Sequence, residues 1–141
     1  MTNYDDIDFS ALDALAEGEV VTHSLVRDIR LPSGKVLALI TLDNGRDHTR
    51  PNTFGPTTLV ELGETLDALA ARAASGEIQA VGVTGKQYIL AAGADLSDIS
   101  RVPSKEVARL VAQLGHKVPG KLSTLGVPSF AFVNGLALGG G

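Results

Sequence analysis

The stretch VNGLALGGG, from Val133 to Gly141, is rich in glycine, and the earlier stretch AAGAD, from Ala91 to Asp95, is built from similarly small residues. Each follows a run typical of a β-strand, 128–133 in the first case and 88–90 in the second. Backbone without bulky side chains can approach a ligand closely and offer its N–H groups. Either stretch alone is a weak signal, but together they predict a site where main chain meets a ligand.

The composition is that of an ordinary globular protein, with 141 residues of which 44% are apolar and 20% charged. A net charge of −4 provides no basic surface for nucleic acid or an anionic membrane. The absence of cysteine excludes disulfides and thiolate metal sites. No stretch approaches the ~18 consecutive apolar residues of a membrane span. We therefore expect a soluble cytoplasmic protein without nucleic-acid or membrane partners.

Residues 1–19 form an acidic N-terminal leader that lacks the basic and apolar regions of a secretory signal. Leu12, Leu15 and Ala16 fall on one face of a possible helix, which Gly18 would end. Because chain termini are often poorly ordered, we expect this leader to be frayed or loosely docked.

Hydrophobic periodicity over the rest of the chain predicts an α/β fold. The expected elements, in order, are a strand over 20–30, a turn at 31–34, an antiparallel and more buried strand over 35–42, a polar loop over 43–55, a helix over 56–75, a strand over 78–84, a helical turn over 96–99, a helix from 103 that Pro119 interrupts or kinks, and a buried strand over 128–133. The helix over 56–75 is the clearest, because its leucines are spaced for a single face. Thr58 and Glu61 match a capping box at its start.

The sequence lacks the residue patterns of several common catalytic and ligand-binding sites. His23, His48 and His116 have no metal-site spacing, so we expect no metal. Neither a nucleophile motif nor a phosphate-binding GxxxxGK[ST] or GxGxxG pattern occurs. The 43–55 loop carries Arg46, His48 and Arg50, which suit either a solvated loop or one that meets a phosphate-bearing ligand. Both interpretations remain open on these residues alone.

Five motifs in the same order and spacing resemble the enoyl-CoA hydratase/isomerase (crotonase) superfamily. They are ALITLDN (38–44), the segment around Asn52, AVGVTG (80–85), AAGADLSDI (91–99) and PSFAFVNGLALGGG (128–141). The resemblance implies a crotonase-like ββα spiral over 20–141, of which this sequence is the N-terminal part only. It also implies a homotrimer or a dimer of trimers at full length. A small Rossmann-like nucleotide domain is the weaker alternative.

The resemblance assigns roles to the two small-residue loops. It implies that the backbone N–H groups of Ala94 and Gly140 bind the oxygen of a coenzyme A (CoA) thioester as an oxyanion hole. Such donors stabilise the negative charge that develops on that oxygen in an enolate-like transition state. The remaining positions implied to contact the acyl-CoA substrate are Arg50, Asn52, Ala92, Gly93, Asp95, Leu96, Gly139 and Gly141. No separate cofactor is implied.

The reaction that the resemblance favours is hydration of a trans-2-enoyl-CoA in fatty-acid β-oxidation. Isomerisation, another reaction of the family, or CoA binding without catalysis are the alternatives. The acid/base glutamates of the hydratases follow the glycines, beyond Gly141, and we do not expect Glu61 or Glu64 to replace them. The domain is therefore expected to be incomplete at Gly141, and the 128–133 strand to lack part of its cover and expose apolar surface.

Overall fold

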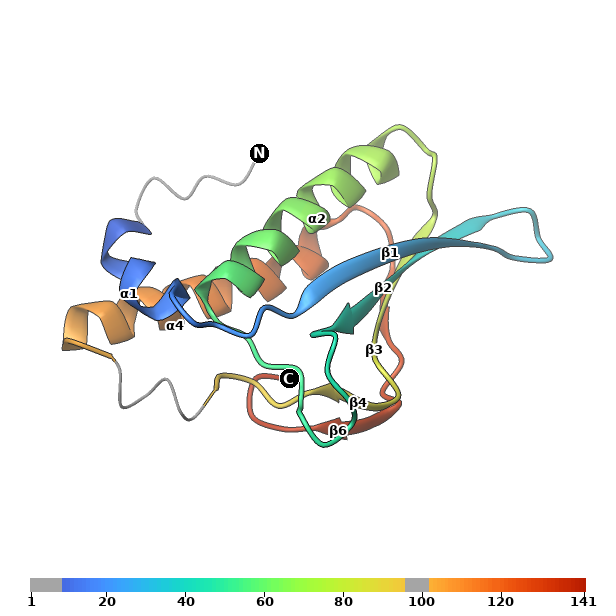
Figure 1. Cartoon of the computed structure of the whole chain (residues 1–141). Coiled ribbons are helices and arrows are strands. Elements are labelled where there is room, and N and C mark those ends of the chain that lie inside the picture. The colour runs from blue at the N-terminus through green and yellow to red at the C-terminus, as the bar shows by residue number, and fades with distance from the viewer. Residues whose placement is uncertain (1–8, 96–101) are drawn as a thin grey trace.

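The computed structural model describes residues 9–95 and 102–141, and in this part of the chain two ββα units follow each other (Figure 1). The elements are η1 (Phe9–Leu12), α1 (Asp13–Ala16), β1 (His23–Arg30), β2 (Val36–Asp43), α2 (Pro56–Ala74), β3 (Ala80–Gly85), β4 (Tyr88–Ala91), α4 (Lys105–Gly120), η2 (Lys121–Thr124), β5 (Ser129–Ala131) and β6 (Gly135–Ala137). The α/β alternation expected from the sequence is confirmed. The helical turn expected over 96–99 lies outside the described residues.

The strands form two sheets of different size. The larger has the order β1-β2-β3-β5, in which β1 and β2 are antiparallel while β2–β3 and β3–β5 are parallel. The smaller consists of β4 and β6 in parallel. The predicted antiparallel hairpin is therefore confirmed, whereas the strand β6 was not expected within a stretch that the sequence indicated to be a loop.

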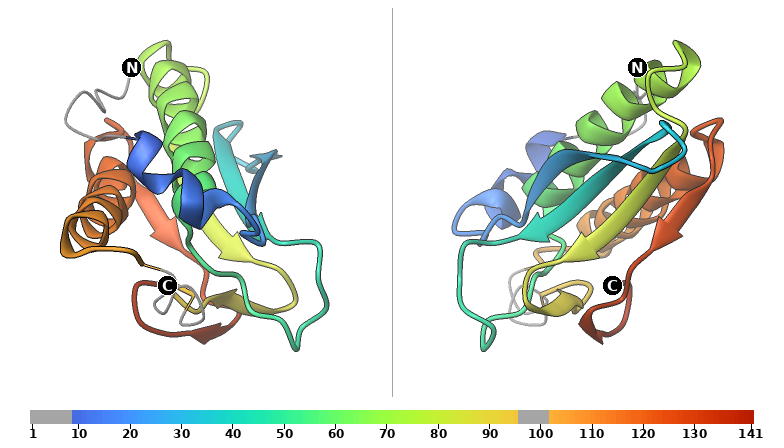
Figure 2. Two further views of the ribbon diagram at one scale, coloured as in Figure 1. Left: turned by 60° about the vertical axis from the view of Figure 1, so that its left-hand side comes forward. Right: turned by 90° about the vertical axis from the view of Figure 1, so that its right-hand side faces the viewer.

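Helices α2 and α4 cover the same face of the larger sheet (Figure 2). The leucine stripe of α2 points into this layer as its spacing predicts, and α4 contributes three buried residues. The main core residues from helices and strands are Leu59, Leu62, Leu66, Leu69, Val107, Leu114, Val118, Ala38, Ile40, Leu42 and Val81. Each fully buried leucine stabilises the fold by about 1.5–3 kcal/mol. Within the described residues, no helix combines the length and apolarity that crossing a membrane requires.

The described part of the N-terminal leader packs on the domain. Leu12 and Leu15 are each only 2% exposed and belong to the core cluster, so the predicted helical face is confirmed. The expectation of a loosely docked leader is wrong for residues 9–16, because these two side chains bury apolar surface against the helices.

Glu19 supplies the cap of α2 from outside the helix. Its carboxylate accepts hydrogen bonds from the N–H groups of Thr57 (2.8 Å) and Thr58 (2.9 Å). The capping box predicted from Thr58 and Glu61 is wrong, because the Thr58 hydroxyl donates to Glu19 and Glu61 accepts from the Ser24 N–H instead. Glu61 also pairs with His23 at 2.9 Å, so it is not a free carboxylate on an exposed helix face.

The 128–133 segment lies at the edge of the larger sheet. The prediction of a buried strand is wrong, because every residue of β5 is exposed and Phe130 is 50% accessible. Phe132 is 48% exposed and stacks on Phe130 with ring centroids 6.4 Å apart. The accompanying expectation of exposed apolar surface is confirmed, since Val133, Leu136 and Leu138 are also exposed.

Replacing Glu19 by alanine should lower the free energy of unfolding by about 1–2 kcal/mol, because two N–H groups of the first turn of α2 lose their acceptor. Urea unfolding followed by circular dichroism measures this change. Glu64→Ala, an exposed carboxylate on the same helix, is the control and should shift stability by no more than about 0.5 kcal/mol. Equal effects of the two substitutions would contradict the capping role.

Candidate functional site

The parallel pairing of β4 and β6 brings the two small-residue loops together. Just beyond the paired strands, the Leu138 N–H donates to the Ala91 carbonyl at 3.0 Å. Gly93 has a φ of +74°, and a Cβ placed on it would lie 2.7 Å from the Gly140 nitrogen. A Cβ on Gly141 would lie 2.2 Å from the Ala91 carbonyl oxygen. Glycine at these two positions therefore permits contact between the two loops that any side chain would prevent.

The turns of these loops leave N–H groups available. Within residues 9–95 and 102–141, the N–H groups of Ala94 and Gly140 have no hydrogen-bond acceptor, and neither do those of Gly93 and Gly139. Such donors can bind an oxygen atom of a ligand. The structure thus offers a small cluster of candidate donors, and only the family resemblance singles out Ala94 and Gly140 among them.

A cavity of about 880 Å³ adjoins the loops. Its lining residues are Val20, Asn44, Arg46, Thr49, Arg50, Pro51, Thr53, Ala92, Ala94, Asp95, Leu138 and Gly139. Five of the predicted site residues are among them, namely Arg50, Ala92, Ala94, Asp95 and Gly139. Gly93, Gly140 and Gly141 lie in the adjoining turns without lining the cavity, and Leu96 lies outside the described residues.

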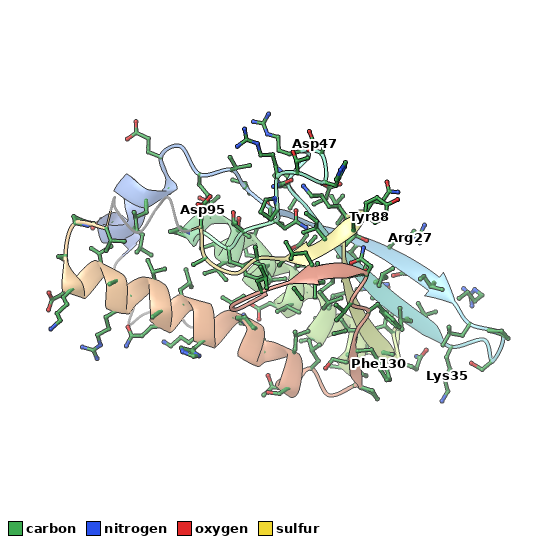
Figure 3. The ribbon with its side chains drawn as sticks, turned by 90° about the horizontal axis from the view of Figure 1, so that it is seen from below. Arg27, Lys35, Asp47, Tyr88, Asp95 and Phe130 are labelled. Atoms are coloured by element: carbon green, nitrogen blue, oxygen red, sulfur yellow. The ribbon has the colours of Figure 1, made fainter. Side chains whose placement is uncertain are left out.

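The wall of the cavity combines three kinds of surface. Arg46 and Arg50 are cationic residues from the 43–55 loop, Val20 and Leu138 are apolar, and the second loop contributes the small residues Ala92 and Ala94 beside the acidic Asp95. Figure 3 looks onto this edge of the fold, where Asp47, Tyr88 and Asp95 lie, while Lys35 is at the far tip of the β1–β2 hairpin. This combination suits a ligand with an anionic portion, an apolar portion and a carbonyl oxygen.

The side chain of Asn52 connects parts of the fold around the cavity. Its side chain is fully buried and donates to the carbonyl oxygens of Leu42 (2.8 Å) and Leu90 (3.0 Å), while it accepts from the Asn44 N–H at 3.1 Å. Its own carbonyl accepts from the Ala92 N–H at 2.8 Å. The Asn52 side chain therefore joins β2, β4 and the 43–55 loop and does not line the cavity. Contact of this residue with the substrate stays a prediction.

Lys86 was not predicted as part of the site. It is 8% exposed, and its Nζ donates to the carbonyl oxygens of Arg46 (3.0 Å) and Arg50 (2.6 Å) and to Asn44 Oδ1. Burial lowers the pKa of the Lys86 ammonium, and the carboxylates of Asp43 and Asp47 partly oppose that effect. The sequence signal that could have identified Lys86 is a lysine directly after a buried strand. The sequence pattern by itself indicates only a turn at this position.

The three histidines come from separate parts of the fold. His23 pairs with Glu61, His48 lies edge-on to Tyr88 with ring centroids 6.0 Å apart, and His116 is exposed on α4. The expectation that the site holds no metal stays a prediction.

Comparison with known proteins identifies relatives among CoA-dependent enzymes, although no family profile matches the chain. It is 33% identical over 96 residues to 4-chlorobenzoyl coenzyme A dehalogenase-2 of an Arthrobacter species, which covers 66% of this chain and 35% of that protein. It is 32% identical over 107 residues to the fatty acid oxidation complex subunit alpha of Shewanella frigidimarina, which covers 74% of this chain and 14% of that protein. The chain thus spans about a third or less of these relatives' length.

Solved structures with the same fold include Pseudomonas aeruginosa DspI, at a TM-score of 0.65 and 28% identity over 89% of this chain and 47% of that chain. An enoyl-CoA hydratase of Bacillus anthracis superposes with a TM-score of 0.66 over 82% of this chain and 42% of that chain; at 24% identity it shows the fold alone.

The mixed larger sheet, the two covering helices and the paired glycine loops define an α/β domain of the crotonase type. The chain belongs to the enoyl-CoA hydratase/isomerase (crotonase) superfamily, whose N-terminal portion it matches. The weaker alternative of a Rossmann-like nucleotide domain is therefore wrong.

Replacing Asn52 by alanine should lower the free energy of unfolding by about 2–4 kcal/mol, because two buried carbonyl groups and one N–H lose their partners. Thermal and urea unfolding measure the loss. Gln87→Ala removes an exposed amide nearby and should stay within about 0.5 kcal/mol of the parent. An Asn52→Ala protein as stable as the control would show that the buried amide does not hold the loop.

Proposed function

We propose that the chain provides the thioester-binding portion of an acyl-CoA enzyme that hydrates an enoyl-CoA. The observation that carries the proposal is that the N–H groups of Ala94 and Gly140 have no acceptor among the described residues and belong to two touching loops beside one cavity. Two donors that approach a single oxygen would form an oxyanion hole.

The chemistry of the proposed site follows from where charge develops. Addition of water to an α,β-unsaturated thioester, or movement of its double bond, places negative charge on the thioester oxygen. Fixed N–H donors stabilise that charge without reorganising, and loss of one donor typically lowers the rate ~10²–10³-fold. Ala94 and Gly140 would supply this stabilisation, while proton transfer requires groups other than these backbone amides.

The cationic side of the cavity supports a CoA ester rather than a simple acyl group. Arg46 and Arg50 line the same cavity as Ala94, and guanidinium groups bind phosphate through several hydrogen bonds at once. The apolar contribution of Val20 and Leu138 suits the pantetheine or acyl portion. No additional cofactor is part of the proposal, because the CoA thioester is itself the substrate.

Two of the names among the relatives and structural neighbours include coenzyme A, which supports a CoA ligand, but the named reactions differ. One relative is a 4-chlorobenzoyl coenzyme A dehalogenase, another a subunit of a fatty acid oxidation complex, and a structural neighbour an enoyl-CoA hydratase. Hydration in β-oxidation is our preferred assignment; isomerisation, another family reaction and binding without catalysis are the alternatives. Assembly as a homotrimer or a dimer of trimers stays a prediction.

Binding of [1-¹³C]crotonyl-CoA, followed by NMR, tests the oxyanion hole directly. We expect the carbonyl resonance to move downfield on binding, because hydrogen bonds polarise the thioester. Gly140→Pro removes one donor and should reduce this shift; where turnover is measurable, it should lower the rate ~10²–10³-fold.

The matched control is Gly140→Ala, which keeps the N–H and whose Cβ would meet no atom within 4 Å. It should bind with the parental carbonyl shift. Loss of the enoyl absorbance band in the parent protein would support hydration, and binding without that loss would favour a non-catalytic CoA module. Failure of the parent to bind crotonyl-CoA would overturn the proposed function.

A further inference from the structure

The side chain of Lys86 extends into the 43–55 loop, part of which lines the cavity. Its Nζ contacts three oxygen atoms of that loop, two of them main-chain carbonyls, those of Arg46 and Arg50. An ammonium group has three donors and no acceptor. All three donors therefore have a partner in one short segment.

These contacts fix the main chain of two cationic residues of the cavity lining. The Nζ binds the carbonyl groups of Arg46 and Arg50, and both residues also line the cavity. Asn44, the third partner, donates its side-chain amide to the Pro51 carbonyl at 2.9 Å. The loop is thus closed around the lysine from residue 44 to residue 51.

The main chain of Lys86 is fixed as well. Its N–H donates to the Leu42 carbonyl at 2.9 Å, and its carbonyl accepts from Asn134 Nδ2 at 2.8 Å. Asn134 directly precedes β6, which leads to the second glycine loop. Lys86 therefore connects the 43–55 loop to β6, the strand that leads to Gly140.

Burial of a charged ammonium group at residue 86 is energetically unfavourable. A buried ammonium loses hydration, which lowers the pKa of Lys86, and the carboxylates of Asp43 and Asp47 oppose that effect only in part. An apolar side chain of similar length would fill the space without this penalty. The ammonium group of Lys86 can, however, hold the 43–55 loop in one conformation through its hydrogen bonds. In that conformation the cationic residues Arg46 and Arg50 both line the cavity.

We propose that Lys86 is a positioning residue that holds the 44–51 loop in the conformation with which Arg46 and Arg50 bind the phosphates of a CoA thioester. The ligand part of this inference rests on the proposed function. The loop-positioning part does not, and it can be measured without any ligand.

Lys86→Met tests both parts, because methionine keeps much of the aliphatic stem and removes the ammonium. Amide hydrogen exchange should become at least about tenfold faster in residues 44–51. The dissociation constant for crotonyl-CoA should rise about tenfold or more, whereas that for S-crotonyl-pantetheine, which lacks the phosphates, should change less than about twofold. Lys35→Met, at the distant hairpin tip, should alter none of these values.

Rescue separates positioning from general damage to the fold. The chain contains no cysteine, so Lys86→Cys can be alkylated in the unfolded state with 2-bromoethylamine, which restores an ammonium at the original length. We expect the refolded, alkylated protein to regain slow exchange in the loop and the parental affinity for crotonyl-CoA. Comparison with the unalkylated protein keeps the test valid even where Lys86→Met folds poorly.

The outcomes distinguish this inference from the proposed function. Unchanged exchange over 44–51 in Lys86→Met would overturn the positioning role whatever the ligand. Equal weakening of crotonyl-CoA and S-crotonyl-pantetheine would overturn the phosphate-specific part and indicate a general structural role. Faster loop exchange in the variant, together with no crotonyl-CoA binding by the parent, would overturn the proposed function while the positioning role stands.

Discussion

The close parallel pairing of β4 with β6 is the constraint on which the candidate site depends. These strands are separated by α4 in the chain, yet their backbones approach so closely that a Cβ on Gly135 would lie 2.0 Å from the Tyr88 carbonyl oxygen. Tyr88 itself adopts a φ of +67°, which is uncommon for a residue with a side chain. The glycines therefore serve two purposes. They allow the strands to meet, and in the adjoining turns they leave N–H groups free for a ligand.

The conformation of the 43–55 loop depends on buried polar side chains. Asn52 joins β2 to β4, and Lys86 closes the 44–51 segment around its ammonium group. Because an unsatisfied buried polar group destabilises a protein strongly, such contacts favour one loop conformation over others. The helices α2 and α4 add apolar packing on one face of the larger sheet, but they do not specify where Arg46 or Arg50 lies. The apolar packing and the geometry of the 43–55 loop thus come from different groups of residues.

Much of the candidate site was predictable because glycine loops and their spacing are local features. Ala92, Ala94, Asp95, Gly139 and Arg50, which the motifs singled out, line one cavity. The buried position of the Asn52 side chain was not predictable, because a polar residue in a polar loop looks the same whether its amide faces solvent or two buried carbonyl groups. Lys86 was missed for a similar reason, since its partners lie about forty residues earlier in the chain.

The sequence by itself determined the ββα alternation, the leucine face of α2 and the family, because periodicity and motif spacing are properties of neighbouring residues. Only the tertiary structure decided that Glu19 caps α2, that the 128–133 segment lies at an exposed sheet edge and that β6 pairs with β4. Each of these depends on which distant groups meet. A hydrogen bond between residues distant in sequence produces no periodic pattern along the chain. It is therefore determined only by the packing of the whole fold.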